Sequence, residues 1–206
     1  MVKKISFKAI YQILSEKSCF IFDLDNTLIN LNTDWIKIKK NLKNFAKKKL
    51  NENISFESLV SLKIIKDNYD EKVLFDFHKI IEKEEHLSVK YNAEKNLNGF
   101  RFFDKICSNF IKKTDSSNLL AILSNNFHST IRLALEKFNI EEKIDIIIGR
   151  DDLSNLKPDP EGLNEIFTKI PRLQKSQMVF FGDSINDKIA AERFLIDFFY
   201  ISSIKI

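Results

Sequence analysis

Five short apolar runs of strand length recur along the chain. They are CFIFDL at 19–24, LLAIL at 119–123, IDIIIG at 144–149, MVFFGD at 178–183 and DFFYIS at 197–202. Each of the first four is followed by polar or turn-forming residues and then by apolar residues at helical spacing. Continuous apolar strands that alternate with helices are typical of a parallel sheet covered on both faces. The pattern therefore predicts an α/β fold with a doubly wound, Rossmann-like parallel sheet.

The alternation is interrupted once, between Asn30 and Gly99, where no strand pattern is convincing and three helical faces follow one another. Their apolar or capping positions are Trp35, Ile38, Leu42 and Phe45, then Ser55, Phe56, Leu59, Val60 and Lys63, then Asp70, Leu74, Phe77 and Ile81. The spacing predicts a helical domain over residues 34–98, inserted into a core formed by residues 19–33 and 99–206. Gly99, at the return to the core, is a candidate hinge.

Residues 1–18 are predicted to form a helical extension, because Phe7, Ile10, Tyr11 and Leu14 share one face of a helix. Their sequence contains neither a long apolar stretch nor a cleavage site of small residues, and no apolar run in the chain approaches transmembrane length. We therefore expect a cytoplasmic protein that does not contact a membrane.

Polar residues follow each of the first four predicted strands. They are Asp23, Asp25 and Thr27 after the first, Ser124 and Asn125 after the second, Lys157 beyond the third, and Asp183 and Asp187 after the fourth. In open α/β sheets, ligands bind beyond the carboxyl ends of the strands, so these side chains should converge on one edge. Clustered carboxylates require a cation to neutralise them, and a set of oxygen ligands suits Mg²⁺.

Each of these residues also has an ordinary structural interpretation. Asp23 and Asp25 alone could mark a strand end and a turn, Ser124 could cap a helix, and Lys157 could be a solvated loop lysine. Asp183 could cap the helix that follows it. The functional interpretation depends on all of them occurring together, each at the end of a predicted strand.

Four motifs, DLDNT, LSNN, LKPDP and GDSIND, occur in this order along the chain. In this order they resemble the haloacid dehalogenase superfamily, in its phosphatase branch, which includes phosphoglycolate phosphatases and β-phosphoglucomutases. The resemblance covers about residues 19 to 202. The helical insert after the first motif is similar to the α-helical, type 1 cap of that family.

The resemblance implies a role for each motif residue. Asp23 would be the nucleophile that forms an aspartyl-phosphate, and Asp25 the general acid and base. Mg²⁺ would be held by Asp23, by the backbone carbonyl of Asp25 and by Asp183. The remaining assignments are phosphate binding by Ser124, Asn125 and Lys157, and a supporting role for Thr27 and Asp187.

These roles imply a Mg²⁺-dependent phosphatase that acts on a small phosphomonoester metabolite. A phosphomutase of the β-phosphoglucomutase type would use the same acids and stays open, as does a catalytically weak binding module on the same fold. The related dehalogenases lack the second acid, so Asp25 argues against that activity.

Two departures from the family pattern stand out. Asn26 occupies a position where glycine is more frequent, but asparagine tolerates a left-handed backbone. The family usually has Ala-Gly before the last strand, whereas this chain reads RFLIDFFYI, so the turn from helix to strand should fall near residues 196–197.

Composition adds limited information about partners. The net charge of +4, from 33 basic and 29 acidic residues, is too mild to require a nucleic acid. The segment KIKKNLKNFAKKK contains seven lysines and no acid, and is interpreted as a solvated helix face or as a surface that steers anionic substrates. Cys19 and Cys107 are expected to be free thiols. We expect a monomer or a weak homodimer.

Overall fold

The computed structural model describes residues 4–56, 61–111 and 118–206, and the chain divides into two compact units. The first, here called the core unit, comprises Met1–Leu31 and Ala93–Ile206. The second, here called the helical insert, comprises Asn32–Asn92. Residues 93–98, which the sequence pattern placed in the insert, belong to the core unit.

A parallel five-stranded sheet forms the centre of the core unit, with strand order β6-β5-β2-β7-β8. The strands are β2 (Cys19–Phe22), β5 (Leu119–Leu123), β6 (Ile146–Ile148), β7 (Met178–Gly182) and β8 (Asp197–Tyr200). The chain passes from β2 to one side of the sheet and returns to its other side through β7, which is the doubly wound arrangement. The predicted fold class is confirmed. Strand β2, the first strand of this sheet along the chain, lies at its centre. Its carboxyl end is therefore at the point where the strand order reverses.

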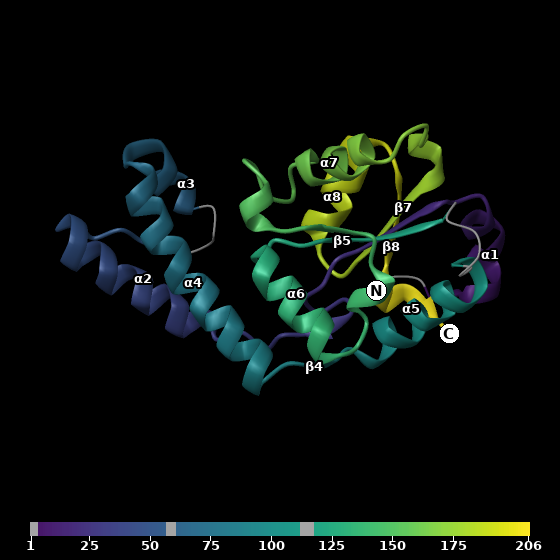
Figure 1. Ribbon diagram of the computed structural model, residues 1–206, viewed down its shortest axis with the longest axis horizontal. Coiled ribbons are helices and arrows are strands. Elements are labelled where there is room, and N and C mark those ends of the chain that lie inside the picture. Colours follow the sequence, from purple (N-terminus) through teal and green to yellow (C-terminus); the bar gives the residue numbers. More distant parts are fainter. Residues whose placement is uncertain (1–3, 57–60, 112–117) are drawn as a thin grey trace. The chain divides into compact units, whose positions relative to one another are not determined.

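Helices cover both faces of this sheet, with α7 and α8 on one face and α5 and α6 on the other (Figure 1). Their bounds are Leu97–Phe110 for α5, His128–Lys137 for α6, Glu161–Lys169 for α7 and Ile185–Phe194 for α8. Successive side chains of a strand point to opposite faces. Accordingly, Ile21 belongs to the cluster that includes Leu163 of α7, whereas the ring of Phe22 packs against Phe103 of α5 with centroids 5.4 Å apart.

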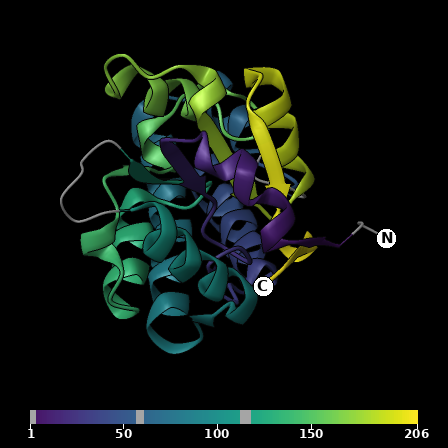
Figure 2. The same ribbon diagram turned by 90° about the vertical axis from the view of Figure 1, so that its right-hand side faces the viewer.

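The two ends of the chain meet in a second, smaller sheet. Strand β1 (Ile5–Ser6) pairs in parallel with β9 (Ile204–Lys205), as Figure 2 shows in purple and yellow. Within the predicted N-terminal extension, the structure forms helix α1 (Phe7–Ser15), and Ser6 accepts a hydrogen bond from the Ala9 N–H as its N-cap. The described residues of this unit also include four short 3₁₀ segments: η1 (Glu141–Lys143), η2 (Arg150–Asp152), η3 (Lys175–Gln177) and η4 (Ile201–Ser203).

The helical insert contains α2 (Trp35–Leu50), α3 (Ser61–Asn68) and α4 (Glu71–Tyr91). Asp70 caps α4 as predicted, since its carboxylate accepts a hydrogen bond from the Val73 N–H. Residues 59 and 60 of the second predicted helix lie outside the described residues. Within the described ranges, no helix combines the length and the apolar character that a membrane span requires.

The two ends of the insert are joined by a short ladder that the sequence pattern did not predict. Strand β3 (Ile29–Asn30) pairs antiparallel with β4 (Glu94–Lys95), and two residues are too few to produce a periodic signal. Gly99 lies just beyond, inside the first turn of α5. A Cβ atom there would lie 1.7 Å from the carbonyl oxygen of Thr27, so this glycine permits close packing, a role different from the hinge expected for it.

Candidate active site

The first motif begins where the central strand ends. Asp23 follows β2 directly, its N–H donates to the carbonyl of Phe181 in β7, and only 6% of the residue is exposed. The chain then turns sharply, because the Leu24 carbonyl accepts the N–H groups of the three residues from Thr27 onward. This turn brings the Thr27 hydroxyl back to the Asp23 carboxylate, with Oγ1 3.3 Å from Oδ2. The end of the sheet thus buries the Asp23 carboxylate, and the Thr27 hydroxyl helps to orient it.

Asp25 lies in the same turn but makes different contacts. Its Oδ1 accepts a hydrogen bond from the Leu31 N–H at 2.8 Å. Desolvation raises the pKa of Asp25 above its ordinary value, although backbone hydrogen bonds from Leu31 and Asn26 oppose the rise. Asn26 has φ 59°, the left-handed conformation that asparagine tolerates. A carboxyl group with a raised pKa is suited to donating a proton near neutral pH.

Lys157 supplies the buried positive charge of the site. Its Nζ lies 2.7 Å from Asp23 Oδ1 and 2.6 Å from Asp187 Oδ1, and it donates to the Leu123 carbonyl at 3.0 Å. Burial by itself would lower the pKa of Lys157, but the two carboxylates outweigh this effect and raise it. The ammonium group is therefore held charged between two acids, one directly after β2 and the other in the first turn of α8.

The fourth motif follows β7. Ser184 caps helix α8, and Asp187 in its first turn accepts hydrogen bonds on Oδ2 from the Ser184 N–H at 3.0 Å and from the Ser184 hydroxyl at 2.6 Å. The cap is therefore Ser184 and not Asp183, whose carboxylate stays available to a ligand. A Cβ on Gly182 would lie 2.6 Å from Asp187 Oδ2, so only glycine lets α8 approach the strand end this closely.

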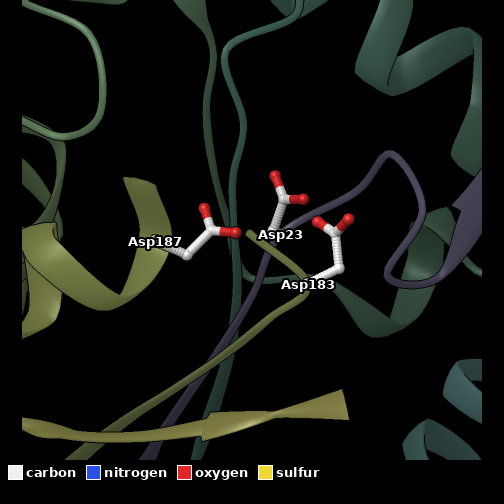
Figure 3. A group of neighbouring side chains, drawn as sticks. All are labelled: Asp23, Asp183 and Asp187. Atoms are coloured by element: carbon white, nitrogen blue, oxygen red, sulfur yellow. The ribbon is translucent and has the colours of Figure 1, made fainter. Parts of the chain in front are cut away.

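The carboxylates of Asp23, Asp183 and Asp187 point toward one another (Figure 3), with one oxygen of each lying within 4.8 Å of the others. Desolvation, Asp187 and Asp183 raise the pKa of Asp23 to about 7 despite the opposing effect of Lys157. Desolvation and Asp187 raise the pKa of Asp183 to about 6. Three acids opposite one lysine leave an excess of negative charge, and a set of carboxylate oxygens fits Mg²⁺.

This group differs in one member from the ligands implied by the family resemblance. Asp187 is included in it, whereas the side chain of Asp25 is not. The resemblance implied the backbone carbonyl of Asp25 as the ligand, so its carboxylate is not needed there. Asp187 already contacts Lys157 and Ser184, which suits a supporting role.

The second motif lies at the end of β5, but its side chains contact the protein itself. Ser124 is 1% exposed, and its hydroxyl donates to Asn126 Oδ1 at 2.8 Å. The Asn125 amide forms a reciprocal pair with the backbone of Lys157, donating to the carbonyl and accepting from the N–H, both at 3.1 Å. Asn125, predicted to bind phosphate, therefore holds the loop that carries Lys157 through its side chain.

Arg150 was not identified from the sequence, although it directly follows the third strand. Its side chain is buried, and Nη2 donates to the Asn125 carbonyl at 2.5 Å, while its backbone N–H donates to the Asn126 carbonyl at 2.7 Å. The guanidinium also lies over the ring of Phe127, 5.2 Å from its centroid. Its position after the third predicted strand was the only signal in the sequence that could have marked Arg150. A single arginine at such a position is common, so this signal was too weak to identify it. Arg150 supports the loop that in turn supports Lys157.

Taken together, the core unit is an α/β domain with a carboxylate–lysine site at the reversal point of its parallel sheet. Residues 20–201 match the family model described as haloacid dehalogenase-like hydrolase. This match covers most of the chain, and the chain belongs to that family.

Similar proteins of known sequence match shorter parts. The chain is 32% identical over 68 residues to pyrophosphatase PpaX from Listeria welshimeri, which is 33% of this chain and 31% of the relative. It is 36% identical over 74 residues to phosphoglycolate phosphatase from Vibrio cholerae, which is 36% of this chain and 32% of the relative. The matched segments thus span about a third of the length of these relatives.

Solved structures resemble the chain over much more of its length. A haloacid dehalogenase-like hydrolase from Bacteroides fragilis superimposes with a TM-score of 0.62 at 21% identity, covering 88% of this chain and 86% of the other. CbbY from Rhodobacter sphaeroides, solved in complex with phosphate, gives a TM-score of 0.61 at 14% identity, covering 89% and 85%. At these identities the likeness shows the fold.

Proposed function

We propose that the chain is a Mg²⁺-dependent phosphatase that hydrolyses a small phosphorylated metabolite through an aspartyl-phosphate on Asp23. The observation that carries the proposal is the buried Asp23 carboxylate, bracketed by the Lys157 ammonium and the Thr27 hydroxyl at the end of the central strand. The family membership and the phosphatase names of the relatives support it.

In the first step, an oxygen of Asp23 attacks phosphorus and the bond to the leaving oxygen breaks. Asp25 transfers its proton to that oxygen, so that an alcohol departs and the phosphoryl group stays on Asp23. In the second step, Asp25 removes a proton from water, which attacks the phosphorus. Inorganic phosphate leaves, and the Asp23 carboxylate and the protonated Asp25 are restored.

The remaining residues bind and neutralise the phosphoryl group. Lys157 would offset its negative charge, and the backbone N–H of Asn125 would donate a hydrogen bond to one of its oxygens. Ser124 would donate another after its hydroxyl turns away from Asn126 Oδ1. Asp187 keeps Lys157 in place. Asp23, the backbone carbonyl of Asp25 and Asp183 would hold Mg²⁺, which when bound reduces the repulsion between the carboxylate and the phosphoryl group.

The test is turnover of a panel of phosphorylated compounds by the purified protein, with Mg²⁺ and with EDTA. The panel contains pyrophosphate as well as phosphomonoesters, because the relatives include a pyrophosphatase and a phosphoglycolate phosphatase. We expect activity that requires Mg²⁺. Sugar monophosphates are assayed for interconversion as well as hydrolysis, which separates a phosphatase from a phosphomutase.

Asp23→Asn is the matched control, because it keeps the shape of the side chain and removes its nucleophilic charge. We expect it to retain the fold and to lose at least about a hundredfold in turnover, as is usual for an essential catalytic group. Turnover that persists in EDTA would argue against the metal. Activity of Asp23→Asn above a hundredth of the wild type would contradict the nucleophile.

A further inference from the structure

Asn96, the residue that caps helix α5, makes three hydrogen bonds to the turn that carries Asp25 and two within α5, where its carbonyl also accepts from the Phe100 N–H at 2.8 Å. Its backbone N–H donates to the Leu28 carbonyl at 3.0 Å. Its side-chain Nδ2 donates to the Asn26 carbonyl at 2.9 Å and to Asn30 Oδ1 at 3.2 Å, while Oδ1 accepts from the Gly99 N–H at 3.1 Å. The Asn26 carbonyl can only accept and the Gly99 N–H can only donate, so together they determine which end of the Asn96 amide is nitrogen and which is oxygen.

The turn that Asn96 contacts, residues 24–31, is here called the acid loop. It is closed on itself by a β-bridge between Asp25 and Ile29 and by the hydrogen bond from the Leu31 N–H to Asp25 Oδ1. A loop held by its own bonds keeps its shape, but its placement relative to the sheet requires contacts to another element. Asn96 provides such contacts at Asn26, the residue next to Asp25.

Helix α5 is a firm support for the acid loop. Phe102 and Phe103 of this helix are completely buried against the sheet. The backbone of Gly99 contacts that of Thr27, because a Cβ atom at residue 99 would lie only 1.7 Å from the Thr27 carbonyl oxygen. Because the helix is anchored in the core, a hydrogen bond from its first turn fixes the acid loop relative to Asp23.

We propose that Asn96 is a positioning residue, whose side-chain amide holds the acid loop so that Asp25 can protonate the leaving oxygen. The inference rests on the proposed phosphatase function and adds a residue outside the four motifs to it. Asn96 acts through the loop and does not touch the reacting atoms.

The inference predicts a dependence on the leaving group. General acid catalysis typically contributes about 10²–10⁴-fold, and a displacement of about 1 Å can forfeit much of it. A basic alkoxide needs the proton of Asp25, whereas p-nitrophenolate leaves readily without it. Loss of the Asn96 donor should therefore slow an alkyl phosphate much more than p-nitrophenyl phosphate.

Two substitutions separate this role from helix capping. Asn96→Asp and Asn96→Ser both keep an oxygen that can accept from the Gly99 N–H, and both remove the amide NH₂ that donates to the Asn26 carbonyl and to Asn30 Oδ1. The serine O–H is one carbon shorter and is a single donor, so it cannot replace both contacts. Using a charged and a neutral replacement excludes an effect of added charge. Asn98→Ala is the matched control, because Asn98 lies in the same turn of α5 and its side chain donates to the Ile201 carbonyl at 2.8 Å.

We expect both Asn96 variants to lose at least about tenfold in kcat on an alkyl phosphate and less than about threefold on p-nitrophenyl phosphate. KM and the melting temperature should change little, and Asn98→Ala should match the wild type on both substrates. Equal losses on the two substrates, or wild-type kinetics in both Asn96 variants, would overturn the positioning role alone. No turnover of any substrate by the wild type with Mg²⁺ would overturn the phosphatase proposal and this inference with it.

Discussion

Replacing Lys157 with methionine removes the ammonium group that separates two buried acids. The side chain keeps a similar length, but Asp23 and Asp187 lose a cation at 2.7 Å and 2.6 Å respectively. Both carboxylates are almost completely buried, so water cannot replace the lost contact. We therefore expect a loss of stability together with the loss of activity.

The expected size follows from the burial. Removing one partner of a buried ion pair typically costs about 3–5 kcal/mol, because the other charge stays buried without compensation. For a chain of this length, 1 kcal/mol corresponds to about 2–4 °C, so the melting temperature should fall by about 6–20 °C at pH 8. At pH 5 the fall should be smaller, because the raised pKa of Asp23, about 7, lets a proton replace the ammonium group.

The assay is thermal unfolding of wild type and variant in EDTA at pH 5 and pH 8, with phosphatase activity measured in Mg²⁺. Lys17→Met is the control, since Lys17 is also buried and its Nζ lies 2.5 Å from Asp197, whose side chain is 51% exposed. Water can solvate Asp197 after the substitution, so this variant should lose less stability. It should keep its activity, because Lys17 lies outside the site.

Three results would each refute a part of this reasoning. Wild-type stability of Lys157→Met at pH 8 without metal would mean that loss of the ammonium group leaves no uncompensated buried charge. A loss that is larger at pH 5 than at pH 8 would give the wrong sign for protonation of Asp23. Activity of Lys157→Met within tenfold of the wild type would contradict a direct role in neutralising the phosphoryl group.

Three further outcomes are expected. The folded-state pKa values of Asp23 and Asp183, about 7 and 6, lie above the ordinary 3.8, so their contribution to stability is present below about pH 4 and is lost as the pH rises through 6–7. Mg²⁺ should therefore raise the melting temperature more at pH 8 than at pH 5, and the opposite order would contradict the metal site. Gly182→Ala should lower kcat by about tenfold or more, because the added methyl group collides with the Asp187 carboxylate. Wild-type kinetics in this variant would show that α8 can shift without an effect on turnover. Leu195 is 80% exposed and has φ 65°, a left-handed conformation that favours glycine. In denaturant unfolding, Leu195→Gly should therefore be more stable than Leu195→Ala by about 1 kcal/mol, and equal stabilities would exclude backbone strain at this residue.

The sequence by itself determined the sheet and the edge on which the site lies. Apolar runs of strand length and helical periodicity are local properties, and β5 was predicted at the residues that the structure shows, Leu119–Leu123. Because all five strands are parallel, residues that follow them meet at one edge, which is why Asp23 and Asp183 could be brought together in advance. The position of the last turn was also predictable, and Leu195 stands in the left-handed conformation near where the family has glycine.

The tertiary structure alone decided which groups each of these residues contacts. Lys157 and Asp23 are 134 positions apart, Asn125 and Lys157 are 32 apart, and Asn96 and Asn26 are 70 apart. No local pattern encodes such pairs, because hydrogen-bond partners are selected when helices and loops dock on the sheet. For the same reason the sequence marked Asn125 as a phosphate ligand and passed over Asn96. The side chains of both form hydrogen bonds to loops at this edge of the sheet, and these contacts follow from packing between distant segments.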